Sequence, residues 1–250
     1  MSQPPAITVE SRAGVLHAVM RDPPRNALGE ALIEALAAVV EEFERGEAKV
    51  LVLSSSLPEF FATGAEVLGE PDVSLEQLAD YRDRIRPPLE RLSACRRPSI
   101  AAIEGRALGA GLELAMACTL RFCSRSARRA MPGLTPGRIP AAGGTQRLPH
   151  LIGRGRALEL MLTGREIRAA EAWRIGLIER LLPGDVVEQS LEIATALTAS
   201  SASAMTAAMV CVDAARDLPH ESGLAVEGAA LVSTAEDSGI ADRPGRQAAA

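Results

Sequence analysis

Lysine is almost missing from this chain, because 26 of its 27 basic residues are arginines and Lys49 is the only exception. A Schiff base needs a reactive lysine amine, and Lys49 opens a predicted buried strand, so we expect no such chemistry. Histidine is scarce too, and His17, His150 and His220 lie far apart in the sequence. We therefore expect no metal site built on histidine.

Cysteines are few, and their spacing matches neither a zinc site nor a dense disulfide pattern: Cys95, Cys118, Cys123 and Cys211. We expect reduced, mostly buried thiols. No segment resembles a signal peptide and no apolar run reaches transmembrane length, so we expect a cytoplasmic protein without a membrane partner. A net charge of −5 gives no reason to expect nucleic acid.

Strands and helices are predicted to alternate along a chain that is long enough, at 250 residues, to bury a large core. Apolar residues at helical spacing over 32–43 predict a helix that Gly46 ends. Ala13 and Gly14 predict a hairpin between strands at 7–11 and 15–20. Further strands are expected at 50–53, 99–103 and 120–123.

The second half of the chain reads as mostly helical beyond Gly143. The double proline Pro87-Pro88 is expected to break any helix in the charged segment 73–95. Alanine-rich helices should fill 185–237, with a break at Pro219, and the tail 238–250 should be frayed.

The most informative segment is Arg106–Cys118, which follows the strand 99–103. Its small residues let the backbone come close to a ligand, and the helix behind them points N–H groups forward. Glu113 is the one carboxylate on an otherwise apolar helix start. This combination is compatible with oxyanion stabilisation and acid–base chemistry, and equally with a tight turn whose acid favours the helix dipole.

Four segments together decide between these readings: 25–28 (RNAL), 60–66 (FFATGAE), 106–118, and 139–148 (IPAAGGTQRL). In order and spacing they resemble the enoyl-CoA hydratase/isomerase (crotonase) family over roughly residues 5–245. The resemblance implies an α/β fold, a ββα spiral superhelix over 1–184 with a C-terminal helical oligomerisation region over 185–250. It also implies a homotrimer or a dimer of trimers.

The resemblance also implies the site. The backbone N–H groups of Ala65 and Ala110 would form an oxyanion hole for the carbonyl oxygen of an acyl-CoA or other acyl-thioester, although Ala110 stands where the family usually has glycine. Glu113 matches the first of the two glutamates that hydratases use. No metal and no separate cofactor is implied, since coenzyme A is part of the substrate. The positions that match substrate or CoA contacts are Arg25, Ala27, Ala62, Gly64 and Gly109.

The second hydratase glutamate is missing, because Gly133 occupies its position and no Asp or Glu lies between Leu114 and Leu158. Glu66, Glu104 or a residue of the segment around Tyr81 are the candidates to approach the site instead. The resemblance favours a structural role for Glu66, which would hold the turn beside Ala65, and Glu104 is expected to be a structural hydrogen-bond partner. The expected activity is enoyl-CoA hydratase-like, with Glu113 as acid and base. The alternatives are a crotonase-family isomerase, decarboxylase or C–C bond enzyme, or an acyl-thioester binding protein that has lost catalysis.

Overall fold

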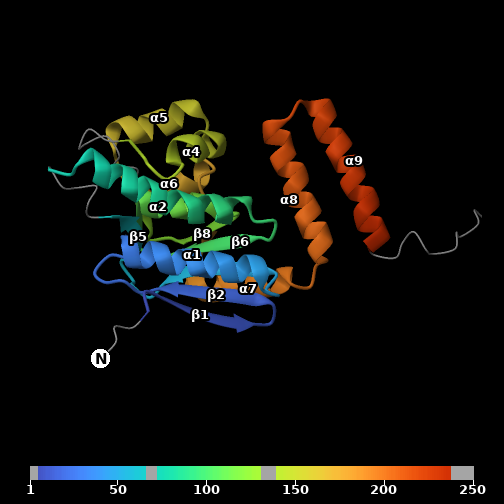
Figure 1. Cartoon of the computed structure of the whole chain (residues 1–250), viewed down its shortest axis with the longest axis horizontal. Coiled ribbons are helices and arrows are strands. Elements are labelled where there is room, and N and C mark those ends of the chain that lie inside the picture. Colours follow the sequence, from blue (N-terminus) through green and yellow to red (C-terminus); the bar gives the residue numbers. More distant parts are fainter. Residues whose placement is uncertain (1–4, 66–71, 131–138, 238–250) are drawn as a thin grey trace, which may run out of the picture. The chain divides into compact units, whose positions relative to one another are not determined.

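The computed structural model describes residues 5–65, 72–130 and 139–237, and the chain divides after Leu197 into two compact units (Figure 1). The first unit contains both β-sheets and helices α1 to α7. The second contains α8 and α9.

The large sheet of the first unit has six strands in the order β1-β2-β4-β6-β8-β11. β1 and β2 form the predicted hairpin, with positive φ at Ala13 and Gly14 in the turn, and every later pair in this sheet is parallel. The strands are β1 (Ile7–Arg12), β2 (Val15–Met20), β4 (Val50–Ser55), β6 (Ser99–Ile103), β8 (Leu120–Ser124) and β11 (Arg180–Leu182).

The small sheet has five short strands in the order β10-β9-β7-β5-β3. The chain alternates between the two sheets: β2 is followed by β3, β4 by β5, β6 by β7 and β8 by β9, and a helix follows each pair. This repetition is the predicted ββα spiral, which is confirmed. The strands are β3 (Ala27–Leu28), β5 (Phe60–Gly64), β7 (Arg106–Leu108), β9 (Arg128–Ala130) and β10 (Ile167–Arg168).

Two clusters of buried side chains cover the two faces of the large sheet. On one face, residues of α1, α2 and α3 pack with alternate residues of the strands into the main core. On the other face, α7 packs against β2, β4, β6 and β8. The helices of this unit are α1 (Glu30–Arg45), α2 (Leu75–Ala94), α3 (Ala110–Ala117), α4 (Gly144–Ile152), α5 (Arg154–Thr163), α6 (Ala169–Arg174) and α7 (Val186–Leu197).

Helix α2 contradicts the prediction that Pro87-Pro88 would break it, because it continues through both prolines. A capping box between Ser74 and Gln77 starts the helix. Ile85 and Leu89 are fully buried on either side of the prolines. The carbonyls that lose a donor belong to residues 83 and 84, whose side chains are exposed, so water can satisfy them. Packing of the apolar face therefore outweighs the local penalty.

The second unit is a pair of packed helices, α8 (Ala202–Asp217) and α9 (His220–Asp237), which meet at the predicted break around Pro219 (Figure 1). Helix α9 has no buried residue, and α8 buries only Ala214. A test for membrane spans finds no single qualifying helix among the described residues; α7 and α8 pass it only when they are counted together.

Candidate active site

Asn26 ties the chain segment before α1 to the end of β5, where Gly64 and Ala65 form the first of two turns at the site. It is fully buried with φ +48°, a conformation that asparagine tolerates better than most residues. Its Oδ1 accepts from Asp22 N at 2.7 Å, and its Nδ2 donates to Phe61 O at 2.9 Å. Its carbonyl accepts from Thr63 N at 3.1 Å. These bonds hold the segment that carries Arg25 and Ala27 against the end of β5.

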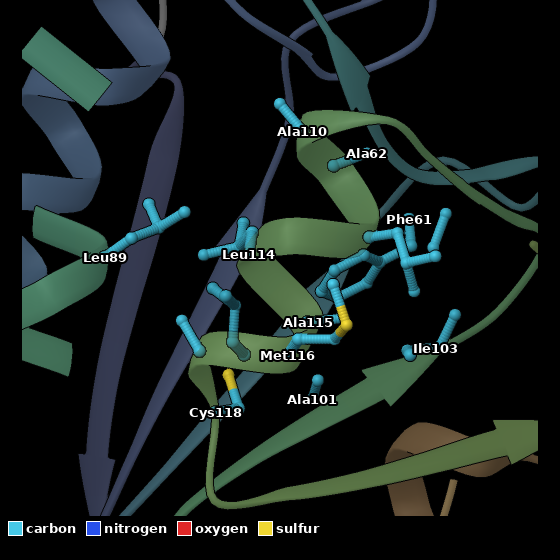
Figure 2. Packing of buried hydrophobic residues seen from close by; sticks show 14 of the residues in the cluster. Phe61, Ala62, Leu89, Ala101, Ile103, Ala110, Leu114, Ala115, Met116 and Cys118 are labelled. Atoms are coloured by element: carbon cyan, nitrogen blue, oxygen red, sulfur yellow. The ribbon is translucent and has the colours of Figure 1, made fainter. Parts of the chain in front are cut away.

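The second turn places α3 directly on β5. Gly109 has φ +54°, which favours glycine, and it precedes Ala110, the first residue of the helix. A Cβ at Gly111 would lie 2.0 Å from Ala62 O, so only glycine permits this approach. Figure 2 shows Ala110 and Ala62 side by side where helix and strand meet. The close contact brings the two turns together.

This arrangement determines where the backbone N–H groups of Ala65 and Ala110 lie. Ala65 is 8% exposed and Ala110 2% exposed. A Cβ at Gly109 would lie 3.9 Å from Gly64 N, so the residues preceding the two alanines are neighbours. The N–H of the first residue of a helix has no intrahelical partner. No loop or turn bond joins the Ala65 N–H to another described backbone group. Among the described residues, then, no backbone carbonyl of a loop or turn takes up either amide.

Glu113 is 2% exposed, one turn into α3, and its carboxylate is held by the N-terminal region of α4. Oε1 accepts from Ala142 N at 2.8 Å and from Gly144 N at 2.7 Å. Burial raises the pKa of Glu113 above its ordinary value, although these N–H groups and the positive charge of Arg147 oppose the change. A buried carboxyl with a raised pKa is suited to take up and return protons.

A cavity of about 590 Å³ opens beside the first turn. Ala27 and Ala65 line it together with residues of α1 and α2, among them Ile33, Gln77, Tyr81 and Arg84. Glu113 is not among the lining residues. Tyr81 lines the cavity as well, and the charge of Glu113 contributes to raising the pKa of its hydroxyl group.

The expected site residues come together to different degrees. Ala62, Gly64, Gly109 and Ala110 lie where β5 meets the start of α3, and Ala27 and Ala65 line the cavity. Glu113 follows within α3 and is held against the start of α4. Arg25 is exposed in the adjoining turn. Gly133 and Glu66 lie outside the described residues.

Two other expectations concern polar groups near the site. Glu104 is occupied elsewhere: its Oε1 accepts from the hydroxyls of Ser124 and Ser126, each at 2.8 Å, so it has a structural role. Among the described residues, no group of three or more His, Cys, Asp or Glu side chains has an arrangement that could hold a metal ion.

Comparison with known proteins identifies the family. The sequence profile described as Enoyl-CoA hydratase/isomerase matches residues 10–247. This chain belongs to that family. It is 34% identical to the 2,3-dehydroadipyl-CoA hydratase of Escherichia coli, over 81% of this chain and 79% of that protein. The chain is therefore an enoyl-CoA hydratase/isomerase-like enzyme of the acyl-CoA class.

Solved structures agree with the fold. The crystal structure of an enoyl-CoA hydratase from Bacillus anthracis has a TM-score of 0.85 and 33% identity, covering 90% of this chain and 89% of that one. Pseudomonas aeruginosa DspI has a TM-score of 0.87 and 30% identity, covering 93% of this chain and 90% of that one. The predicted crotonase-like fold is thus confirmed.

Proposed function

We propose that this enzyme binds the carbonyl oxygen of an acyl-CoA thioester between the N–H groups of Ala65 and Ala110. The observation that carries the proposal is the contact of Gly111 with Ala62, which brings the two turns together. Two preorganised N–H donors stabilise the negative charge that develops on the thioester oxygen when an enolate forms. Neither alanine needs a functional side chain, since the amide does the chemistry.

Glu113 transfers the proton in this proposal. Because Oε1 is held by two N–H groups, Oε2 is the oxygen that we assign to the substrate. In hydration, water gives a proton to the Glu113 carboxylate while the water oxygen forms a bond to the β-carbon of the substrate. The π electrons of the double bond move onto the thioester oxygen. The α-carbon of the enolate then takes a proton back from Glu113, which completes the addition of water across the double bond.

Fast hydration is unfavourable here because Gly133 stands at the sequence position where hydratases have their second glutamate. With no carboxyl at that position, Glu113 must both accept the proton from water and return one to the α-carbon. Each acid–base group typically contributes about 10²–10⁴-fold to the rate. We therefore expect slow hydration of crotonyl-CoA. The same absence favours the second candidate function, an acyl-thioester binding protein without turnover.

The cavity beside Ala27 and Ala65 is our candidate for the thioester arm of coenzyme A, and the exposed Arg25 is a candidate contact for its phosphates. No metal or further cofactor enters this scheme. A carrier-protein thioester is the competing form of substrate, because it presents the same pantetheine arm without the nucleotide. Comparing an acyl-CoA with the matching acyl-pantetheine separates binding of the arm from binding of the nucleotide.

The decisive experiment is a thermal-shift screen over a panel of acyl-CoAs, followed by mass spectrometry of each stabilising ligand after incubation. A ligand present at 100 times its Kd adds about 2.7 kcal/mol of stability, which raises the Tm by several degrees. A mass gain of one water supports hydration, and an unchanged ligand that still stabilises the protein supports the binding function. Absence of stabilisation by any acyl-CoA contradicts the proposal.

The variant Gly133→Glu tests the role of the missing acid directly. It should increase crotonyl-CoA hydration if the new carboxylate reaches the water. The gain is expected to be partial if Gly133 holds a backbone conformation that glutamate resists. Fast hydration by the wild type that survives Glu113→Gln contradicts the assignment of Glu113.

We also propose that the chain assembles as a trimer or a dimer of trimers through its C-terminal helices. The support is the set of large apolar side chains that α8 and α9 leave exposed, including Val212, Leu224, Leu231 and Val232. Light scattering should give a mass near three or six times 26.3 kDa. A monomer that persists at micromolar concentration contradicts this proposal.

A further inference from the structure

The hydroxyl of Tyr81 is a buried polar group without a hydrogen-bond partner among the described residues. Tyr81 lies in α2, is 6% exposed, and lines the cavity together with Ala65. Buried hydroxyls in native proteins nearly always have a partner, and leaving one unsatisfied is unfavourable. A phenylalanine would fill the same space without that penalty. The hydroxyl therefore calls for a functional explanation.

The surroundings of the phenol keep it protonated. Burial raises the pKa of Tyr81 above its ordinary value, and the charge of Glu113 raises it further. The N–H of Ala65, which lines the same cavity, opposes this effect. A neutral phenol at physiological pH is a hydrogen-bond donor and not a base. It can serve an acceptor that the Ala65 N–H also serves.

We propose that the Tyr81 hydroxyl is a third hydrogen-bond donor to the thioester oxygen, beside the N–H groups of Ala65 and Ala110. This inference rests on the proposed function, since it needs an acyl-thioester in the cavity. The donor acts most strongly on the enolate, whose oxygen carries more charge than the oxygen of the ground-state thioester. Tyr81 is then a catalytic residue that stabilises the enolate and transfers no proton.

Two ligands of equal chain length test the inference. Butanoyl-CoA binds as an uncharged thioester, whereas acetoacetyl-CoA can bind as its enolate, which absorbs in the near ultraviolet. The variant Tyr81→Phe keeps the ring and removes only the hydroxyl. The control Arg82→Gln changes the neighbouring side chain of α2, which is exposed and pairs with Asp83.

The inference predicts that Tyr81→Phe weakens acetoacetyl-CoA binding by about 10–100-fold, as expected for a hydrogen bond to a charged acceptor. The near-ultraviolet enolate signal should fall with it. Binding of butanoyl-CoA should change little, and Arg82→Gln should leave both affinities unchanged. The variant without ligand should have a higher Tm, because an unsatisfied hydroxyl has been removed.

Three results contradict the inference or its basis, and they can be told apart. Equal weakening of both ligands by Tyr81→Phe assigns Tyr81 to packing of the cavity wall. Unchanged affinity for both ligands removes any role of the hydroxyl in binding. If neither ligand binds to the wild type, the proposed function itself fails.

The chain contains a single tyrosine, which gives a direct spectroscopic check. Replacing tyrosine by 3-fluorotyrosine during expression labels position 81 alone. Acetoacetyl-CoA should shift the ¹⁹F resonance more than butanoyl-CoA does, because the donor faces a charged oxygen. Equal shifts with both ligands oppose a preference for the enolate.

Discussion

Helices α3 and α9 are both built largely of small and apolar residues, yet the chain treats them in opposite ways. Every residue of α3 is buried, whereas α9 buries none. Figure 2 shows α3 surrounded by core side chains, among them Leu89, Phe61 and Ile103. An almost wholly apolar helix such as α3 needs such surroundings. Helix α9 also carries charged residues, among them Glu221 and Glu227, and within its unit it packs against α8 alone. The difference fits the two proposals above, since α3 carries the candidate acid Glu113 and α9 leaves large apolar side chains exposed.

The largest difference between the helices should appear when a glutamate in each is neutralised. Glu113→Gln in α3 keeps an acceptor for Ala142 N and Gly144 N but removes the proton-transferring group. Turnover of any substrate should fall about 10²–10⁴-fold, without loss of the folded structure. The matched change Glu227→Gln, at an exposed position of α9, should leave turnover unchanged. Steady-state kinetics on both variants check this, and equal rates for all three proteins remove Glu113 from the mechanism.

Truncating a leucine in each helix tests the difference in packing. Leu114 is 0% exposed and Leu231 is 70% exposed. Leu114→Ala should lower the free energy of unfolding by about 2–5 kcal/mol, through lost burial and a cavity. Leu231→Ala should change it by no more than about 0.5 kcal/mol in the isolated chain. Denaturant unfolding measures both values, at concentrations low enough to keep any oligomer dissociated.

A third pair compares glycines. Gly111→Ala should destabilise the protein by about 1–3 kcal/mol, because its Cβ would meet the backbone of Ala62. It should also weaken acyl-CoA binding, since α3 must move off β5. Gly228→Ala in α9 meets no atom within 4 Å and should stabilise its helix by about 0.5–1 kcal/mol. Thermal unfolding and ligand titration check the pair, and tolerance of Gly111→Ala contradicts the close contact.

The smallest expected effect is the pH dependence that burial gives to Glu113. Because burial raises its pKa, the basic form is lost at a higher pH than for an ordinary glutamate of pKa 4.5. The profile of kcat/KM should therefore fall on its acidic side at a pH above 4.5. If kcat/KM falls only at a pH below the ordinary glutamate pKa of 4.5, the result contradicts a buried Glu113 as the base.

The raised pKa of Glu113 should also affect the free energy of unfolding, which should fall as the pH rises, whereas kcat/KM should rise. A raised folded-state pKa means that the protonated form is favoured in the folded protein, so this contribution to stability is lost as the pH rises through that pKa. Glu113→Gln lacks this loss, so its stability relative to the wild type should improve from pH 4 to pH 8. Urea unfolding at several pH values measures the trend.

The sequence predicts much of the site because the decisive residues follow one another along the chain. The small residues 106–118 and 60–65 carry the two turns in their order, and Glu113 is conspicuous as a lone acid. The continuation of α2 through Pro87-Pro88 was not predictable, because it depends on the burial of Ile85 and Leu89 in the main core, where α2 packs against α1 and α3. The segment around Tyr81 was a candidate to approach the site, but no motif pointed to the Tyr81 side chain itself, because the cavity wall that it shares with Ala65 is formed by elements distant in sequence. Its candidate role depends on tertiary packing alone.

The most direct test of the account is a crystal structure of this protein with a bound acyl-CoA. The account predicts that the thioester oxygen lies about 2.7–3.1 Å from the backbone nitrogens of both Ala65 and Ala110. It also predicts that Glu113 stays on the Ala142 and Gly144 amides through Oε1. A complex in which either alanine N–H is bonded to a backbone carbonyl, or in which the thioester lies away from the junction of β5 and α3, contradicts it.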